Sequence, residues 1–273
     1  MPATARAAVT YCTVGGVALT MNIFLPQTGA GPHPAAVMVH GGGWEHGDAG
    51  SPNRLSPVES GLVSQGFVVA SLNYRLAPQY LWPAQIEDVK CAIRYLRAEA
   101  ATYAIDTTRI GAWGSSAGGH LVSMLGTVGP SAGYDVGQYL DQSSAVQAVV
   151  DEWGPADLTG AGWGPAGTQA ITQVFGVAPG QASPVLRAAS PVSYVAAGDP
   201  PFLIIQGAQD STVPPSQSQE FAAALKSAGV PETLVMVQNA GHGLVPTGGV
   251  PTPSVSQVNH MIVSFFVTHL LSR

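Results

Sequence analysis

Short apolar runs recur along the chain, each bounded by glycine, proline or polar residues. They lie at 35–39, 67–72, 110–113, 146–150, 202–205 and 234–237. Short uninterrupted apolar runs are typical of parallel strands that are covered on both faces. Two more strands are expected at 7–13 and 17–25, because Val14-Gly15-Gly16 between them is a hairpin signal.

Stretches with helical periodicity separate these runs. Residues 84–99 carry apolar side chains at spacings of three and four, namely Ile86, Val89, Ile93 and Leu96. Further helices are predicted at 117–128, at 216–228 and near the C-terminus, where one face would hold Val258, Met261, Ile262, Phe265 and Phe266. Alternating strands and helices predict an α/β fold, in which a doubly wound, mostly parallel sheet has an antiparallel N-terminal edge.

Residues 154–183 interrupt this alternation. They are rich in glycine, proline, alanine and threonine, with Trp163 and Phe175 as the main large apolar side chains. A segment of this length without a strong periodic pattern is typical of a functional loop or a small lid. We therefore expect an insertion at about 154–183 within a single domain that spans residues 1–273.

Composition narrows the possible partners. Charged residues make up only 10% of the 273 residues, the net charge is −6, and lysine and arginine are scattered. A nucleic-acid surface needs clustered basic residues, and a membrane span needs about 18 consecutive apolar residues. Neither is present, and the N-terminus lacks a signal-peptide pattern. We expect a soluble protein, either cytoplasmic or exported as a mature form, and the oligomeric state stays open.

Cys12 and Cys91 are the two cysteines of the chain. They are too few for a disulfide framework, and neither has a second cysteine or a histidine at metal-ligand spacing. Buried free cysteine behaves as a small apolar residue. We expect two unpaired thiols and no metal site, although one cross-link between them remains an alternative.

A candidate nucleophile follows the 110–113 strand. The segment Gly114-Ser115-Ser116-Ala117-Gly118 fits G-x-S-x-G with Ser116 in the centre. In that motif a tight strand-to-helix turn exposes the central hydroxyl above the sheet. Ser115 takes the variable position. The motif alone also occurs as a plain small-residue turn, so the assignment depends on what the other strand ends carry.

The segment His40-Gly41-Gly42-Gly43-Trp44 follows the 35–39 strand. Glycines at such a position let backbone N–H groups point at the oxygen of a tetrahedral intermediate. The expected donors of this oxyanion hole are Gly42, Gly43 and Ala117, the residue after the nucleophile. A phosphate-binding loop is the alternative, but the chain has no G-x-G-x-x-G pattern and no Walker lysine.

A carboxylate and an imidazole follow the last two predicted strands. Asp210 comes after 202–206 and His242 after 232–237, each in a loop that contains glycine. In the predicted triad, His242 takes the proton from Ser116 and Asp210 orients the imidazole. Asp157 after the 146–150 strand is an alternative acid. His120, one turn beyond Ser116, is expected to pack in the core or on a helix face.

Five segments together resemble a known group of enzymes. They are His40 to Trp44, Asn73 to Pro78, Gly114 to Leu121, the turn at Asp210, and Ala240 to Gly243. Their order and spacing resemble α/β-hydrolase esterases of the hormone-sensitive-lipase-like kind and, most closely, the bacterial bifunctional deacetylase and feruloyl esterase family. The resemblance implies an α/β-hydrolase fold and ester hydrolysis through an acyl-serine without a cofactor. Gln206 departs from the family pattern, which has a histidine there, and Arg75 is expected to pair with a carboxylate such as Asp88.

Four apolar residues next to these segments are candidates for substrate contact, namely Trp44, Trp153, Trp163 and Leu244. Tryptophan offers a flat apolar wall to an acyl or aryl group. We therefore predict a carboxylesterase for short- to medium-chain or aromatic esters, of the feruloyl or acetyl type, on small molecules or on polymers. The alternatives are an arylformamidase or small peptidase, and a noncatalytic receptor on the hydrolase fold.

Overall fold

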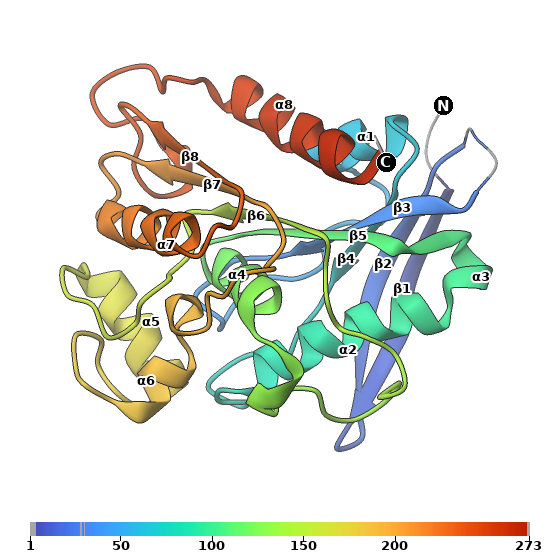
Figure 1. The fold of residues 1–273 in the computed structure, drawn as a ribbon, viewed down its shortest axis with the longest axis horizontal. Helices are drawn as coiled ribbons and strands as arrows, with labels where there is room; N and C mark the ends of the chain where they lie inside the picture. Colours follow the sequence, from blue (N-terminus) through green and yellow to red (C-terminus); the bar gives the residue numbers. More distant parts are fainter. Residues whose placement is uncertain (1–3, 28, 30, 272–273) are drawn as a thin grey trace.

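The computed structural model describes residues 4–27, 29 and 31–271. A sheet of eight strands runs through the molecule in the order β1-β2-β4-β3-β5-β6-β7-β8 (Figure 1). The strands are β1 Thr4–Val14, β2 Val17–Leu25, β3 His33–Val39, β4 Val68–Leu72, β5 Ile105–Ser115, β6 Ala148–Glu152, β7 Phe202–Gly207 and β8 Glu232–Val237. Strands β3 to β8 are parallel, and β1 and β2 add the predicted antiparallel edge.

Helices cover both faces of this sheet (Figure 1). They are α1 Pro57–Ser64, α2 Ala84–Ala98, α3 Ala100–Tyr103, α4 Ala117–Thr127, α5 Pro165–Phe175, α6 Pro184–Ala188, α7 Pro215–Ser227 and α8 Val255–Phe266. One apolar cluster joins the sheet to α2, α4 and α7, and a second joins the opposite face to α1 and α8. The predicted doubly wound arrangement is confirmed. In the described residues, no helix is long and apolar enough to cross a bilayer.

The predicted elements agree with the structure to within a few residues, except for β5. This strand begins at Ile105, well before the predicted 110–113 run, because its first residues pair with the start of β3 across a register shift. Helix α1 was not predicted, although its start carries a local signal. Ser56 accepts a hydrogen bond from the Glu59 N–H, and Glu59 accepts one from the Ser56 N–H. This reciprocal capping box satisfies two N–H groups that would otherwise lack partners.

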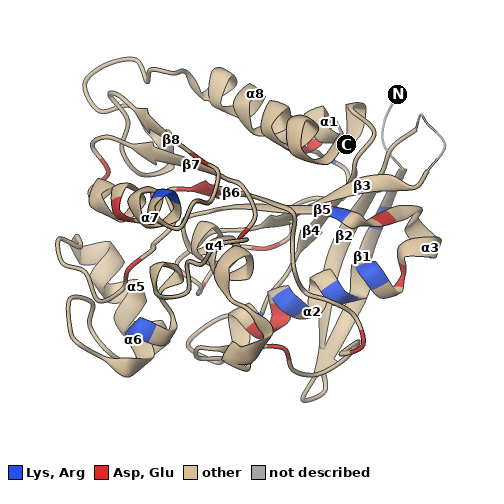
Figure 2. Ribbon diagram, viewed as in Figure 1, with Lys and Arg blue, Asp and Glu red and all other residues tan. Residues whose placement is uncertain are grey.

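The basic residues of α2 are buried instead of facing solvent. Lys90, Arg94 and Arg97 lie on this helix, where basic residues are blue in Figure 2, and they are 2%, 1% and 9% exposed. Lys90 and Arg94 both bind the Asp135 carboxylate, and Arg97 donates to the carbonyl groups of Ser143 and Ala145. These charges hold the 135–145 segment against the helix.

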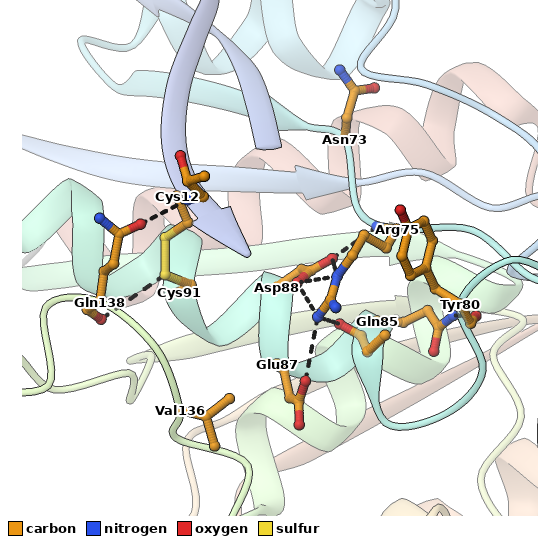
Figure 3. A network of polar contacts seen from close by, with 12 residues as sticks. Cys12, Asn73, Arg75, Tyr80, Gln85, Glu87, Asp88, Cys91, Val136 and Gln138 are labelled. Atoms are coloured by element: carbon orange, nitrogen blue, oxygen red, sulfur yellow. Dashed lines mark hydrogen bonds and ion pairs between the residues drawn. A yellow bond between two sulfur atoms is a disulfide. The ribbon is translucent and has the colours of Figure 1, made fainter. Parts of the chain in front are cut away.

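Arg75, which follows β4, makes the predicted ion pair with Asp88 of α2 (Figure 3). The Arg75 guanidinium donates to both carboxylate oxygens of Asp88, at 2.8 to 3.0 Å, and the Arg75 backbone N–H donates to the same carboxylate. The Asp88 side chain is fully buried. The pair therefore ties the carboxyl end of β4 to the first turns of α2.

Cys12 of β1 and Cys91 of α2 form a disulfide (Figure 3), so the expectation of two unpaired thiols is wrong. The pairing register of β1 with β2 shifts between Thr10 and Cys12, and this bulge leaves Tyr11 and Cys12 buried in succession. A regular strand would send neighbouring side chains to opposite faces. The bulge and the crossing of β1 over α2 are tertiary features, so the spacing of the two cysteines did not reveal the pair.

Candidate active site

The three residues predicted as a triad meet at the carboxyl ends of β5, β7 and β8. His242 Nε2 lies 2.9 Å from Ser116 Oγ, and His242 Nδ1 lies 2.8 Å from Asp210 Oδ2. The loops that carry them are separated by 126 residues between Ser116 and His242 and by 32 residues between Asp210 and His242. The geometry is that of a nucleophile, a base and an orienting carboxylate in hydrogen-bond contact.

Ser116 occupies the turn between β5 and α4 in an unusual backbone conformation, with φ 55° and ψ −119°. The turn is tight enough to demand glycine on both sides. A Cβ at Gly114 would lie 2.6 Å from the Gly118 backbone, and a Cβ at Gly118 would lie 2.0 Å from the Val39 carbonyl oxygen. Backbone conformations of this kind cost energy and occur mainly where a function needs them. The local sequence therefore forces the Ser116 hydroxyl to the top of the sheet.

The Asp210 carboxylate is completely buried and has four hydrogen-bond donors. Oδ1 accepts from the N–H groups of Thr212 and Val213, and Oδ2 accepts from His242 and from Gln206 Nε2 at 3.1 Å. Four donors hold a carboxylate in one orientation. Asp157, the alternative acid, accepts instead from the N–H and hydroxyl of Thr159. The structure therefore places Asp210 next to His242 and excludes Asp157 from that position.

The predicted oxyanion donors lie on either side of Ser116. Gly42 and Gly43 have φ of 105° and 63°, a region open mainly to glycine, and Ala117 is the first residue of α4. In the part of the chain that the structure describes, the N–H groups of these three residues have no protein acceptor. Unpaired N–H groups at a helix start and in a glycine loop are suited to a developing negative charge.

Two of the four predicted substrate contacts do not hold. Trp44 is 2% exposed and packs edge-on against Phe175, with ring centroids 5.3 Å apart, while Leu244 is 3% exposed in the apolar cluster below α8. Both have positive φ, 61° and 56°, a conformation that sequence patterns do not reveal for non-glycine residues. Their side chains belong to the core behind the site.

Trp153 and Trp163 are both partly exposed. The Trp153 ring lies 6.3 Å from the His242 ring, in a nearly perpendicular orientation. Trp163 lies just before α5, and its indole N–H donates to the Gly160 carbonyl oxygen. The role of both residues in binding an acyl or aryl group stays a prediction.

Helix α5 of the predicted insertion lies against two catalytic loops, which the sequence did not predict. A Cβ at Gly167 would lie 2.5 Å from the Thr212 carbonyl oxygen in the acid loop, and a Cβ at Gly43 would lie 3.3 Å from Ala170. The Gln173 amide, with its nitrogen facing Glu45, donates to both oxygens of that carboxylate at 3.0 Å. Part of the insertion is therefore a helix that packs against the acid loop and the glycine loop. Gly167, Ile171 and Val174 are buried at spacings of four and three residues, and this helical periodicity was the sequence signal for α5.

Comparison with known proteins identifies the family. The BD-FAE family model matches residues 21–225. The chain belongs to the BD-FAE family. It is similar to the esterases LipQ and LipC of Mycobacterium tuberculosis, with 34% identity over 72% of this chain and 32% identity over 78%. These stretches make up 46% of LipQ and 53% of LipC, so the chain spans about half the length of these curated relatives.

Solved structures extend the likeness of this BD-FAE chain over its whole length. A carbohydrate esterase from gut microbiota, solved in truncated form, has a TM-score of 0.82 at 30% identity, and the match covers 99% of this chain and 98% of that one. Butyrate-bound esterase 2 of Thermogutta terrifontis has a TM-score of 0.79 at 26% identity, covering 100% of this chain and 96% of that one. The chain therefore has the α/β-hydrolase fold.

Two acidic side chains next to the nucleophile of the BD-FAE chain have unusual electrostatics. Burial raises the pKa of Asp151 to about 6, although the Ser123 hydroxyl and the Gly154 N–H oppose the shift by donating to the carboxylate. Burial and the neighbouring Asp151 charge raise the pKa of Glu152 to about 8. The Glu152 carbonyl oxygen accepts from the Ser116 N–H. These groups lie at the end of β6, where the sequence showed only two adjacent carboxyls.

A cleft of about 990 Å³ lies away from the triad of the BD-FAE chain. It is lined by residues that precede β6 and β7 and that follow α4, among them Ser144, Gln147, Gly129 and Pro201. These positions lie at the amino ends of the strands, opposite the catalytic loops. Ligands of open α/β sheets bind at the carboxyl ends, so we assign the chemistry to the Ser116 side.

Proposed function

We propose that this chain is a serine hydrolase that cleaves carboxylic esters through an acyl-enzyme intermediate. The observation that carries the proposal is the continuous contact from Ser116 Oγ through the His242 imidazole to the Asp210 carboxylate. The esterase names of LipQ and LipC and of the two structural neighbours support it.

In the first half of the reaction, Ser116 Oγ attacks the ester carbonyl carbon while His242 Nε2 takes the hydroxyl proton. The carbonyl oxygen becomes an oxyanion that the N–H groups of Gly42, Gly43 and Ala117 bind. Asp210 holds the imidazole in the tautomer with Nδ1 protonated and stabilises its cation. The carbon–oxygen bond to the alcohol then breaks, the proton of His242 passes to the departing alcohol, and an acyl-serine remains.

In the second half, water replaces the alcohol. His242 takes a proton from the water, the resulting hydroxide attacks the acyl carbon, and the carboxylic acid leaves as His242 returns a proton to Ser116 Oγ. Every proton in this cycle moves through a group of the chain, and no cofactor takes part.

The substrate class follows from the surroundings of the triad. Trp153 and Trp163 offer flat apolar walls, which suit a short- to medium-chain or aromatic acyl group. One neighbour is described as a carbohydrate esterase and another was solved with butyrate bound. We therefore propose feruloyl- or acetyl-type esters, on small molecules or attached to a polymer.

A pair of serine variants tests the proposal. We expect Ser116→Ala to lower kcat for a p-nitrophenyl butyrate substrate by at least ~10⁴-fold and to abolish labelling by a fluorophosphonate. The neighbouring Ser115→Ala is the matched control and should keep kcat within about threefold of the wild type, because Ser115 takes no part in proton transfer. Equal labelling of the wild type and Ser116→Ala would contradict the nucleophile assignment. Faster turnover of an N-formylaniline than of an aryl ester would favour a formamidase.

A further inference from the structure

His120, in the first turn of α4, binds the indole of Trp44, the residue that follows the oxyanion glycines. The Trp44 indole Nε1–H donates to His120 Nδ1 at 3.2 Å, and His120 Nε2 lies 2.7 Å from the Ala189 carbonyl oxygen. A carbonyl oxygen can only accept and an indole N–H can only donate. The two contacts therefore select the neutral His120 tautomer that carries its proton on Nε2.

Both rings are enclosed. His120 is fully buried, Trp44 is 2% exposed, and their centroids lie 5.2 Å apart with the rings nearly perpendicular. Phe175 and Trp82 close the same aromatic cluster around them. Water does not reach the indole N–H in this position, so His120 is its one acceptor among the described residues. Burial lowers the pKa of His120 to about 4, which keeps the ring neutral and Nδ1 free to accept.

The backbone at Trp44 needs such an anchor. Its φ is 61°, in the left-handed region that L-residues other than glycine, asparagine and aspartate rarely adopt. A strained residue keeps this conformation only when its surroundings hold it. Because Trp44 directly follows Gly43, rotation of the Trp44 backbone would move the N–H groups of the glycine loop.

His120 also contacts the turn that carries Ala117, the third oxyanion donor. Its backbone N–H donates to the Ser116 carbonyl oxygen at 3.0 Å in the first turn of α4, the turn that begins with Ala117. One residue thus contacts the glycine loop through its side chain and the nucleophile turn through its backbone.

We propose that His120 is a positioning residue that sets how far the Gly42 and Gly43 N–H groups lie from the Ala117 N–H, acting through its hydrogen bond to Trp44. The inference rests on the proposed ester hydrolysis and deepens it. A misplaced donor weakens the binding of the transition-state oxyanion more than the binding of the neutral ester. The role should therefore show in kcat, with little change in KM.

Two conservative variants separate the two hydrogen bonds of His120. In His120→Asn the amide oxygen lies where Nδ1 was and still accepts from Trp44, whereas the bond to Ala189 is lost. In His120→Gln the longer side chain places its amide near the old Nε2 position and keeps the bond to Ala189, whereas the acceptor for Trp44 is lost. Trp44→Phe removes the N–H donor and keeps an aromatic ring in the cluster.

The measurement is kcat and KM for p-nitrophenyl butyrate, with active sites counted by fluorophosphonate titration so that unfolded protein does not enter kcat. We expect His120→Gln and Trp44→Phe each to lose roughly 10- to 100-fold in kcat, with KM within twofold of the wild type. His120→Asn should stay within about threefold of the wild type. The double variant His120→Gln/Trp44→Phe should lose no more kcat than the less active of the two single variants, because both changes remove the same hydrogen bond.

Three results would overturn the positioning role. They are a kcat of His120→Gln within twofold of the wild type per titrated site, equal losses in His120→Asn and His120→Gln, and multiplied losses in the double variant. Ser116→Ala is assayed on the same ester. If it is inactive, any of these results rejects the His120 role alone, whereas activity in Ser116→Ala would reject the proposed function and the His120 role with it.

Discussion

At the scale of single residues, the two acids at the end of β6, Asp151 and Glu152, both have raised pKa values but differ in their hydrogen-bond partners. Asp151 is buried and has donors from Ser123 and Gly154, whereas no hydrogen bond to the Glu152 carboxyl is found within the described residues. Glu152 lies in register between Ser115 of β5 and Ile205 of β7. Burial and the neighbouring Asp151 charge both disfavour the ionised Glu152 carboxyl, and no donor among the described residues offsets them, so its proton is retained to higher pH.

The raised pKa of Glu152 predicts that the protein loses stability as the pH rises. Its pKa is raised from an ordinary 4.5 to about 8 in the folded protein. Between these values the folded state holds a proton that the unfolded chain has released, so the free energy of unfolding falls as the pH rises through this window. We expect Glu152→Gln to match the wild type at pH 5 and to be more stable by roughly 1–2 kcal/mol at pH 9, a figure reduced for the partial exposure of the side chain.

Urea unfolding of both proteins at the two pH values measures this difference. Asp141→Asn, at an exposed position in the 135–145 segment, controls for the general effect of removing one negative charge. A constant difference between wild type and Glu152→Gln from pH 5 to pH 9 would contradict the prediction.

At the scale of elements, the ion pair between Arg75 and Asp88 joins β4 to α2. The Asp88 side chain is 0% exposed and that of Arg75 is 10% exposed, so the pair is nearly dry. Burial raises the pKa of Asp88 even though the Arg75 contacts oppose the shift. The carboxylate therefore depends on its partner, and loss of the guanidinium would leave a buried charge without compensation.

Arg75→Met should lower the free energy of unfolding by about 3 kcal/mol, because breaking a buried pair costs more than the pair itself contributes. The double variant Arg75→Met/Asp88→Leu should recover much of this loss, since no uncompensated charge remains. Thermal and urea unfolding measure both variants. A stable Arg75→Met variant with a raised KM would instead indicate that Arg75 contacts the substrate.

At the scale of the whole molecule, the Cys12–Cys91 disulfide fastens the N-terminal hairpin to the body of the fold. The two residues are separated by 79 positions in the sequence, and the bond links the outermost strand of the sheet to α2. Closing a long loop covalently restricts the unfolded chain more than the folded one. Helix α2 and strand β1 carry no triad residue, so the cross-link serves stability without entering the chemistry.

Cys12→Ala/Cys91→Ala should lower the free energy of unfolding by about 4.5 kcal/mol, the value expected for a loop of this length. Its kcat per titrated active site should equal that of the wild type at a temperature where both are folded. Reduction of the wild type with dithiothreitol should lower its midpoint of unfolding to a similar extent. An unchanged midpoint after reduction, with the thiols shown to be free, would contradict this prediction.

The candidate site could be predicted largely from local sequence for a physical reason. Parallel strands place their carboxyl ends on one edge of the sheet, so residues that directly follow apolar runs must converge there. Ser116, Asp210 and His242 each follow such a run, and the glycines around Ser116 are required by steric contacts within the turn and with the end of β3. Chemistry that depends on strand ends and tight turns is encoded over a few neighbouring residues.

Side-chain orientation in irregular loops was not accessible in the same way. Trp44 and Leu244 were expected to face the substrate, but their side chains are buried, and each residue lies in a loop with a positive φ. Sequence patterns report the periods of helices and strands, and they carry no signal for a strained loop residue whose conformation depends on what packs against it.

The sequence by itself determined the order along the chain of the eight strands and of helices α2, α4, α7 and α8, the antiparallel edge and the identity of the residues at the strand ends. Apolar periodicity and turn chemistry are local, and they act before distant parts of the chain meet. Only the tertiary structure decided that Cys12 joins Cys91, that α5 packs on the acid and oxyanion loops, and that His120 binds Trp44. These contacts join segments far apart in the chain, and their formation depends on how whole layers pack, a property that no short stretch of residues contains.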